Sequence, residues 1–95
     1  MDEKTMIYAD CIRKWGLDSQ IIMLAEETLE LSHATLGLLR ASKQKVALKN
    51  LAEEIVDAEF MIDEIKAYFG SDLQQWIDYW KPEKLKRLKD RLKDD

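Results

Sequence analysis

The sequence predicts an all-α fold, an antiparallel helical bundle of two long helices and two or three short ones. Only three Gly and one Pro interrupt its 95 residues, whereas β-rich chains need such residues at every reversal. Apolar residues also recur at helical spacing along most of the chain. A chain of this length forms one domain, spanning residues 1–95, and buries only about 60–65% of its surface. We therefore expect a homo-oligomer, a dimer or a tetramer, to complete the bundle.

The first two expected helices meet at Gly16. Residues 3–14 carry apolar side chains at loosely helical spacing and end before Trp15 and Gly16. Asp18 suits the N-cap of a second helix, extending to about Ser42, because its carboxylate can accept the free N–H groups of the first turn. One apolar stripe of this helix consists of Gln20, Met23, Leu24, Leu31 and Leu38, and a nearly opposite one of Ile22, Leu29 and Leu36. A helix that is apolar on two sides needs two partners, which also favours an oligomer.

The second half of the chain continues the helical pattern. Residues 42–45 are polar and are expected to connect to a third helix. The apolar positions of that helix alternate in steps of three and four: Leu48, Leu51, Ile55, Ala58, Ile62, Ile65 and Phe69. This period is typical of bundle helices that cross at a shallow angle. Gly70 is expected to end the third helix, Ser71 to cap a short fourth helix through Trp76 and Trp80, and Pro82 to lie in the first turn of a basic C-terminal helix.

Charge and composition exclude several classes of function. The net charge of −4 and the pI near 5.0 argue against binding to a nucleic-acid polymer, which requires a basic surplus. Cys11 is the single cysteine, so no intramolecular disulfide can form, and a reducing, cytoplasmic location is expected. No apolar run reaches about 18 residues and the N-terminus is acidic, so neither a membrane span nor a signal peptide is expected.

Two pairs of acidic residues indicate a possible site for a metal ion. Glu27 and Glu30 are three residues apart in the second helix, as are Glu54 and Asp57 in the third. Residues three apart share a helix face, so packed antiparallel helices can bring all four carboxylates together. Beside an apolar stripe, such a cluster is unfavourable unless a cation neutralises it, and Mg²⁺ prefers oxygen ligands. A solvated acidic surface is the alternative interpretation.

These residues resemble the EExxE…ExxD signature of the all-α NTP pyrophosphatase superfamily, which includes MazG. Trp15-Gly16 ahead of Gln20, and LKRLKDRL at 85–92, are similar to the flanks of small MazG-like proteins. The resemblance implies Mg²⁺, with Mn²⁺ as a substitute, held by Glu27, Glu30, Glu54 and Asp57. It also implies hydrolysis of nucleoside triphosphates between the α and β phosphates, which yields a nucleoside monophosphate and pyrophosphate, with Glu27 or Glu30 as general base.

Other residues are candidates for contacts with the substrate. Lys84 and Arg87 match a phosphate-binding element of larger MazG proteins, although Pro82 and Leu85 depart from its pattern and a solvated basic face fits equally well. Trp15 could stack on a base or pack in the core, and Gln20 could contact a base edge. Asn50 lies one turn before Glu54 and could bind a phosphate.

Two rival interpretations of the sequence differ from a nucleoside triphosphate pyrophosphatase. One is a non-catalytic helical interaction module whose glutamates are merely solvated. The other keeps the fold but assigns phosphoribosyl-ATP or an alarmone as the substrate, because specificity depends on base contacts that the motif does not specify.

Overall fold

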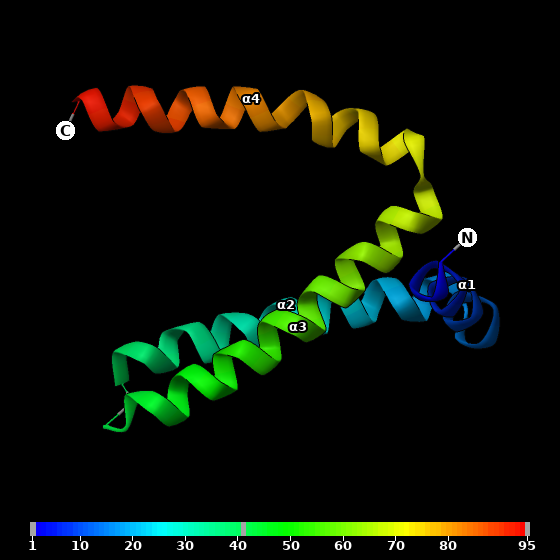
Figure 1. The fold of residues 1–95 in the computed structure, drawn as a ribbon, viewed down its shortest axis with the longest axis horizontal. Helices are drawn as coiled ribbons and strands as arrows, with labels where there is room; N and C mark the ends of the chain where they lie inside the picture. Colours follow the sequence, from blue (N-terminus) through cyan, green and yellow to red (C-terminus); the bar gives the residue numbers. More distant parts are fainter. Residues whose placement is uncertain (1, 41, 95) are drawn as a thin grey trace.

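The computed structural model describes residues 2–40 and 42–94, and within these ranges it contains four α-helices and no strand (Figure 1). The helices are α1 (Glu3–Trp15), α2 (Leu17–Arg40), α3 (Gln44–Phe69) and α4 (Ser71–Asp94). The prediction of an all-α fold is confirmed. The number of long helices is corrected from two to three, because the two short C-terminal helices expected from the sequence form the single helix α4.

The corner between α1 and α2 depends on Gly16. Asp2 begins α1 by accepting a 2.8 Å hydrogen bond from the backbone N–H of Thr5, which lowers the pKa of Asp2. Gly16 ends α1 with φ +87°, a conformation that favours glycine, and donates its N–H to the carbonyl of Ile12. Its own carbonyl then accepts from the N–H of Gln20. Asp18 is therefore not the N-cap: α2 starts at Leu17, and Asp18 lies in its first turn.

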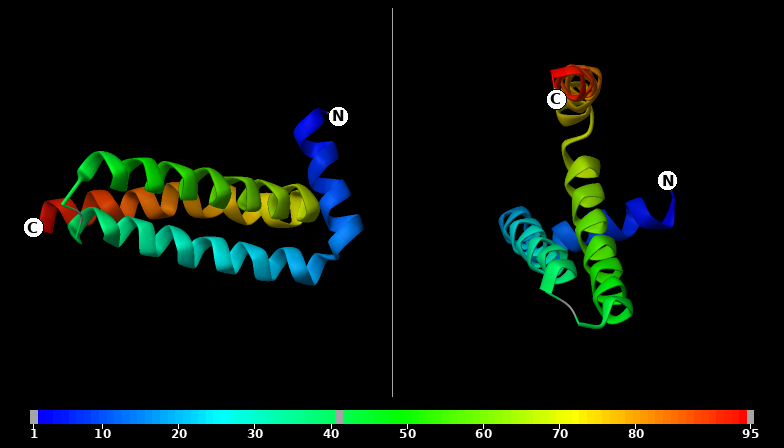
Figure 2. Two further views of the ribbon diagram at one scale, coloured as in Figure 1. Left: turned by 90° about the horizontal axis from the view of Figure 1, so that it is seen from below. Right: turned by 90° about the vertical axis from the view of Figure 1, so that its left-hand side faces the viewer.

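Helices α2 and α3 form an antiparallel hairpin, and α1 crosses the end of the hairpin where α2 begins (Figures 1 and 2). The α2 helix ends at Arg40 rather than at about Ser42. Its inner face confirms much of the predicted stripe, since Gln20 is buried and Leu24, Leu31 and Leu38 are half-buried. The outer stripe of Ile22, Leu29 and Leu36 is exposed.

The buried face of α3 is rotated from the predicted one. Ala58, Met61 and Ile65 form the buried apolar core, and Leu51 is half-buried. Four residues of the predicted seam remain exposed instead: Leu48, Ile55, Ile62 and Phe69. In the hairpin, the face of α3 that carries Glu54 and Asp57 lies toward α2. The four exposed apolar residues therefore lie on a face of α3 that points away from α2. As a result α3, like α2, has a second apolar face that the rest of the chain leaves uncovered.

Helix α4 leaves the hairpin at Gly70. The φ of +58° at Gly70 reverses the chain, and its carbonyl accepts from the N–H groups of Leu73 and Gln74, so Ser71 is the first helical residue and not the cap. Pro82 lies inside α4 rather than at the start of a new helix. Its ring removes one backbone donor from the helix, yet the helical turns continue on both sides. Among the described residues, α4 packs against α3 alone (Figure 1).

The molecule is extended for its length. Its radius of gyration is 16.7 Å, whereas a compact domain of this size has one of about 12 Å. The difference arises because α4 projects over the hairpin without lying on it (Figure 2). No helix in the described ranges has both the length and the apolar character needed to cross a membrane.

Candidate functional site

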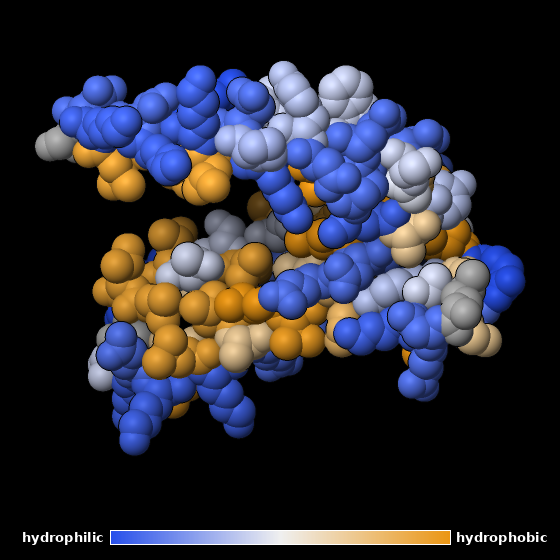
Figure 3. Space-filling view, turned by 45° about the horizontal axis from the view of Figure 1, so that its top comes forward, coloured by the Kyte–Doolittle hydropathy of each residue, from blue (hydrophilic) through white to orange (hydrophobic). Residues whose placement is uncertain are grey.

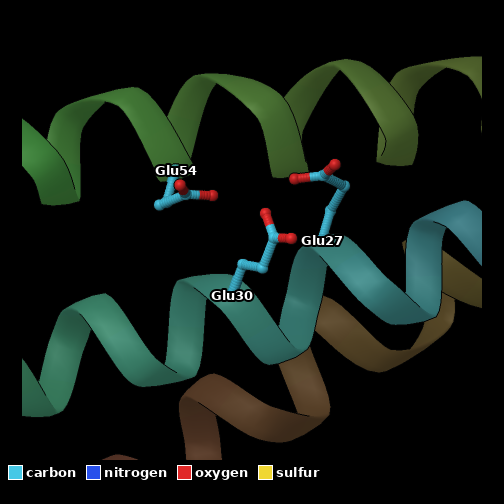
Figure 4. Close-up of side chains that lie close together, drawn as sticks. All are labelled: Glu27, Glu30 and Glu54. Atoms are coloured by element: carbon cyan, nitrogen blue, oxygen red, sulfur yellow. The ribbon is translucent and has the colours of Figure 1, made fainter.

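Three glutamates converge between α2 and α3. Glu27 and Glu30 come from α2 and Glu54 from α3, and one carboxylate oxygen of each lies within 4.8 Å of the others (Figure 4). Glu27 and Glu54 are half-buried, and Glu30 is exposed. The three-residue spacing on α2 places two carboxylates on one face, and the antiparallel packing brings the third opposite them. We call these three residues the glutamate trio.

The charges of the trio have no ion-pair partner among the described residues. The Oε2 atoms of Glu27 and Glu54 are buried and have no hydrogen-bond partner in the part of the chain that the structure describes. Burial, followed by the charges of Glu30 and Asp57, raises the pKa of both Glu27 and Glu54. In the described part of the chain, the one ion pair joins Arg13 to Asp10 on α1, so no basic side chain is paired with the trio.

The donor set of the trio fits a hard divalent cation. Its ligands are carboxylate oxygens, which Mg²⁺ and Mn²⁺ prefer over the thiolates and imidazoles that softer ions select. A cation would also satisfy the two buried oxygens that lack partners. Asp57, the fourth predicted ligand, does not belong to the trio. It lies near enough to raise the pKa of Glu27 and of Glu54.

Two cavities lie on either side of the trio along the hairpin. A cavity of about 500 Å³ borders Glu54 on the side of the α2–α3 connection, and Asn50, Lys43 and His33 line it. A second cavity, of about 290 Å³, lies toward α1, and both Trp15 and Gln20 line it. The structure thus brings Asn50 to the groove beside Glu54, whereas Trp15 and Gln20 line a separate cavity toward α1 that no residue of the trio lines.

Lys84 and Arg87 are not brought to this groove. Both lie on α4, where the Lys84 Nζ is 5.4 Å and the Arg87 guanidinium carbon 5.5 Å from the centroid of the Trp80 ring. Because Gly70 turns α4 away from α2, this chain does not supply its own C-terminal cations to the trio. Any contact of Lys84 or Arg87 with a phosphate at the trio would require a second copy of the chain.

Sequence reasoning missed Glu64. Its side chain is only 3% exposed, and its Oε2 has no hydrogen-bond partner. Glu64 follows Asp57 by seven residues, just as Glu27 follows Gln20 by seven. Seven residues correspond to about two helical turns, so each pair lies on one face. This shared spacing is the signal that could have identified Glu64.

No protein-family model matches the chain, and no curated protein and no solved structure matches it either.

Proposed function

We propose that this protein is a Mg²⁺-dependent nucleoside triphosphate pyrophosphohydrolase. The main support for the proposal is the glutamate trio, in which two buried carboxylate oxygens have no hydrogen-bond partner among the described residues. The resemblance of the EExxE…ExxD residues to the all-α NTP pyrophosphatases supports the same chemistry. We include Asp57 as a fourth acidic residue of the site, since its charge acts on Glu27 and Glu54.

The residues of the chain have distinct roles in this reaction. When bound, Mg²⁺ or Mn²⁺ offsets the charge that develops on the phosphate oxygens. Glu27 or Glu30 orients a water molecule and accepts its proton while the water oxygen attacks phosphorus. The bond between the α and β phosphates breaks, and pyrophosphate leaves. In the 500 Å³ cavity, Asn50 and Lys43 are suited to bind the departing phosphates, because they offer N–H donors and a positive charge.

Pyrophosphate release from a panel of ribo- and deoxyribonucleoside triphosphates tests the proposal. We expect turnover with Mg²⁺ or Mn²⁺ and none in EDTA. Glu27→Gln and Asp57→Asn should each reduce the rate of hydrolysis by more than about 100-fold. Losses of roughly 10–100-fold are typical when a residue that only hydrogen-bonds to a metal ligand is replaced. Glu59→Gln is the matched control, because Glu59 is an exposed carboxylate on α3 outside the trio.

The panel also separates the rival functions. It should include phosphoribosyl-ATP and an alarmone, and preferential cleavage of either would keep the chemistry and change the substrate. Folded protein that neither binds Mg²⁺ nor cleaves any compound would contradict the enzyme and favour a non-catalytic interaction module. Circular dichroism of each variant checks that the fold persists.

We also propose that the protein is a homo-oligomer, either a dimer or a tetramer. Helix α4 carries an apolar surface that we call the α4 stripe, formed by Trp76, Ile77, Trp80, Leu85 and Leu88. Figure 3 shows apolar side chains on the side of α4 that faces the hairpin, apolar side chains on the hairpin below, and open space between them. A second copy of the chain is suited to this space, because it carries matching uncovered apolar faces on α2 and α3.

A further inference from the structure

The cavity beside Glu54 is larger than its part in the proposed hydrolysis requires. Pyrophosphate, the leaving group of that reaction, consists of only two linked phosphate groups. The volume of the cavity is about 500 Å³, whereas sites of about 300–1,000 Å³ are typical of drug-sized ligands. The cavity therefore has room for a leaving group longer than pyrophosphate.

Hydrogen-bond donors line this cavity. They are the His33 imidazole, the Ser42 hydroxyl, the Lys43 ammonium and the Asn50 amide. All four can donate to phosphate oxygens, and the bond from Lys43 would be strengthened by its charge. Within residues 2–40 and 42–94, Lys43 has no ion-pair partner, so its charge is available to an anion.

The 290 Å³ cavity on the other side of the trio is less suited to phosphates. Glu64 lines it and is only 3% exposed, so its carboxyl group repels a phosphate when it is ionised. Lys4 also lines this cavity, but its Nζ already lies 5.5 Å from the centroid of the Phe60 ring. A phosphate chain that starts at the trio is therefore favoured toward Lys43.

The 500 Å³ cavity extends well beyond the trio along the hairpin. Glu54 belongs to the trio and also lines the cavity, so the two adjoin. On α2, His33 and Gly37 follow Glu30 by three and seven residues. At the helical rise of 1.5 Å per residue, these positions lie about 4.5 Å and about 10 Å beyond Glu30. A phosphate chain leaving the trio would pass His33 before it reaches Gly37.

We propose that this cavity accepts the longer leaving group of nucleoside tetraphosphates, which the protein hydrolyses to a nucleoside monophosphate and inorganic triphosphate. The proposal rests on the proposed function, since it extends the substrate class of the same site. The water oxygen attacks the α phosphorus, and its proton passes to Glu27 or Glu30. The bond from the α phosphorus to the bridging oxygen breaks, and that oxygen leaves with the three terminal phosphates.

The products of a nucleoside tetraphosphate test the proposal. The tetraphosphate is that of the nucleoside whose triphosphate is cleaved fastest, with Mg²⁺ present, and ion-exchange chromatography separates the products. We expect kcat/KM at least equal to that of the triphosphate, with nucleoside monophosphate and inorganic triphosphate as the products. Release of nucleoside diphosphate and pyrophosphate would show that the site fits only two leaving phosphates, and it would overturn the proposal. A tetraphosphate that is not cleaved would do the same.

Gly37→Leu is the decisive variant. Gly37 lines the cavity inside α2, and no atom lies within 4 Å of the position where its Cβ would be, so a leucine side chain can enter the cavity. We expect kcat/KM for the tetraphosphate to fall about tenfold or more relative to that for the triphosphate. Thr35→Leu is the matched control, because Thr35 is exposed on the same helix and does not line the cavity. Equal effects of Gly37→Leu on both substrates would contradict the proposal.

Inorganic triphosphate and pyrophosphate test the cavity without hydrolysis of a nucleotide. His33 is the single histidine of the chain, so its imidazole C–H signals in NMR report on the cavity alone. In saturating Mg²⁺, we expect triphosphate to bind about tenfold more tightly than pyrophosphate, because its third phosphate adds a charge-assisted hydrogen bond to Lys43. Lys43→Gln should remove this difference. Equal affinities in the wild-type protein, or unmoved His33 signals, would refute the assignment.

The outcomes also separate this proposal from the proposed function. Tighter binding of inorganic triphosphate that depends on Lys43, without cleavage of any nucleotide, would support the cavity as a phosphate site and contradict the hydrolase. Cleavage of nucleoside triphosphates but not of tetraphosphates would support the hydrolase and contradict the longer leaving group.

Discussion

Folding places the carboxyl groups of Glu27 and Glu54 where their ionised forms are unfavourable. Their burial and the neighbouring acidic charges raise both pKa values, so the folded chain binds protons more readily than the unfolded chain does. Where the pKa of a carboxyl is raised by folding, its contribution to stability is present at acidic pH and is lost as the pH rises through the folded-state pKa. Asp2 acts in the opposite direction, because its N-cap hydrogen bonds lower its pKa.

This linkage predicts how stability depends on pH in the absence of a cation. In EDTA, the free energy of unfolding should fall as the pH rises above about 4, the ordinary pKa of a Glu carboxyl. Mg²⁺ binds the ionised carboxylates, so saturating Mg²⁺ should reduce or reverse this slope. Urea unfolding at a series of pH values measures both effects.

Single substitutions identify the residues responsible for the slope. Glu27→Gln should flatten it in EDTA, whereas the control Glu59→Gln should retain the wild-type slope, because Glu59 lies outside the trio. Part of the slope should persist in Glu27→Gln, since the pKa of Glu64 is also raised by burial. A stability that rises with pH in EDTA across this range would contradict the electrostatic account of the trio.

At the scale of the elements, two glycines decide where the helices go. Gly16 and Gly70 have φ values of +87° and +58°, which L side chains adopt only at a cost. Neither has any atom within 4 Å of the position where a Cβ would lie, so the requirement is conformational and not steric crowding. Gly16 lets α1 cross the start of the hairpin, where residues of α1 line the cavity of Trp15 and Gln20, while Gly70 directs α4 away from α2.

Alanine substitutions test whether Gly16 and Gly70 are required for their positive φ values, by comparison with a glycine of ordinary helical conformation. Gly16→Ala and Gly70→Ala should each lower the free energy of unfolding by about 1–3 kcal/mol, the cost of holding an L residue in a positive-φ region that glycine favours. Gly37→Ala is the matched control: Gly37 lies inside α2 with open space around it, so alanine there should raise stability by about 0.5–1 kcal/mol. Chemical denaturation of the three variants measures the difference, and equal effects at all three positions would refute the assignment.

At the scale of the whole molecule, apolar surface exceeds what one chain can bury. Within residues 2–40 and 42–94, Ala58, Met61 and Ile65 are the only buried apolar residues, whereas the outer faces of α2 and α3 and the α4 stripe remain exposed. The extended shape places α4 over the hairpin with open space beneath it (Figure 3). In the proposed oligomer, Lys84 and Arg87 of a second copy are candidates for the basic side chains at the trio, which has no ion-pair partner among the described residues.

Charged substitutions in the α4 stripe test this assembly. Leu85→Glu combined with Leu88→Glu should convert the oligomer to monomers, because burying two carboxylates at an apolar interface is costly. Lys86→Glu combined with Lys93→Glu is the control, since it places two acidic residues on the opposite side of the same helix. Light scattering coupled to size-exclusion chromatography gives the mass of each variant. A wild-type protein that is monomeric at all concentrations would overturn the proposal.

The helical class, and the bounds of α1, α2 and α3 to within a few residues, could be predicted from the sequence, because helical periodicity and glycine positions are local properties. Of the four carboxylates predicted to meet, Glu27, Glu30 and Glu54 do, and Asp57 lies outside the trio. The helical spacing places each pair on one face, but it does not say how closely the two faces approach. Three features could not be predicted: which apolar face of α3 is buried, that α4 continues through Pro82, and that Glu64 lines the same cavity as Gln20. The buried face and the cavity depend on how one helix is rotated against another. Because α2 and α3 each carry two apolar faces, the local sequence pattern does not indicate which of the two is buried.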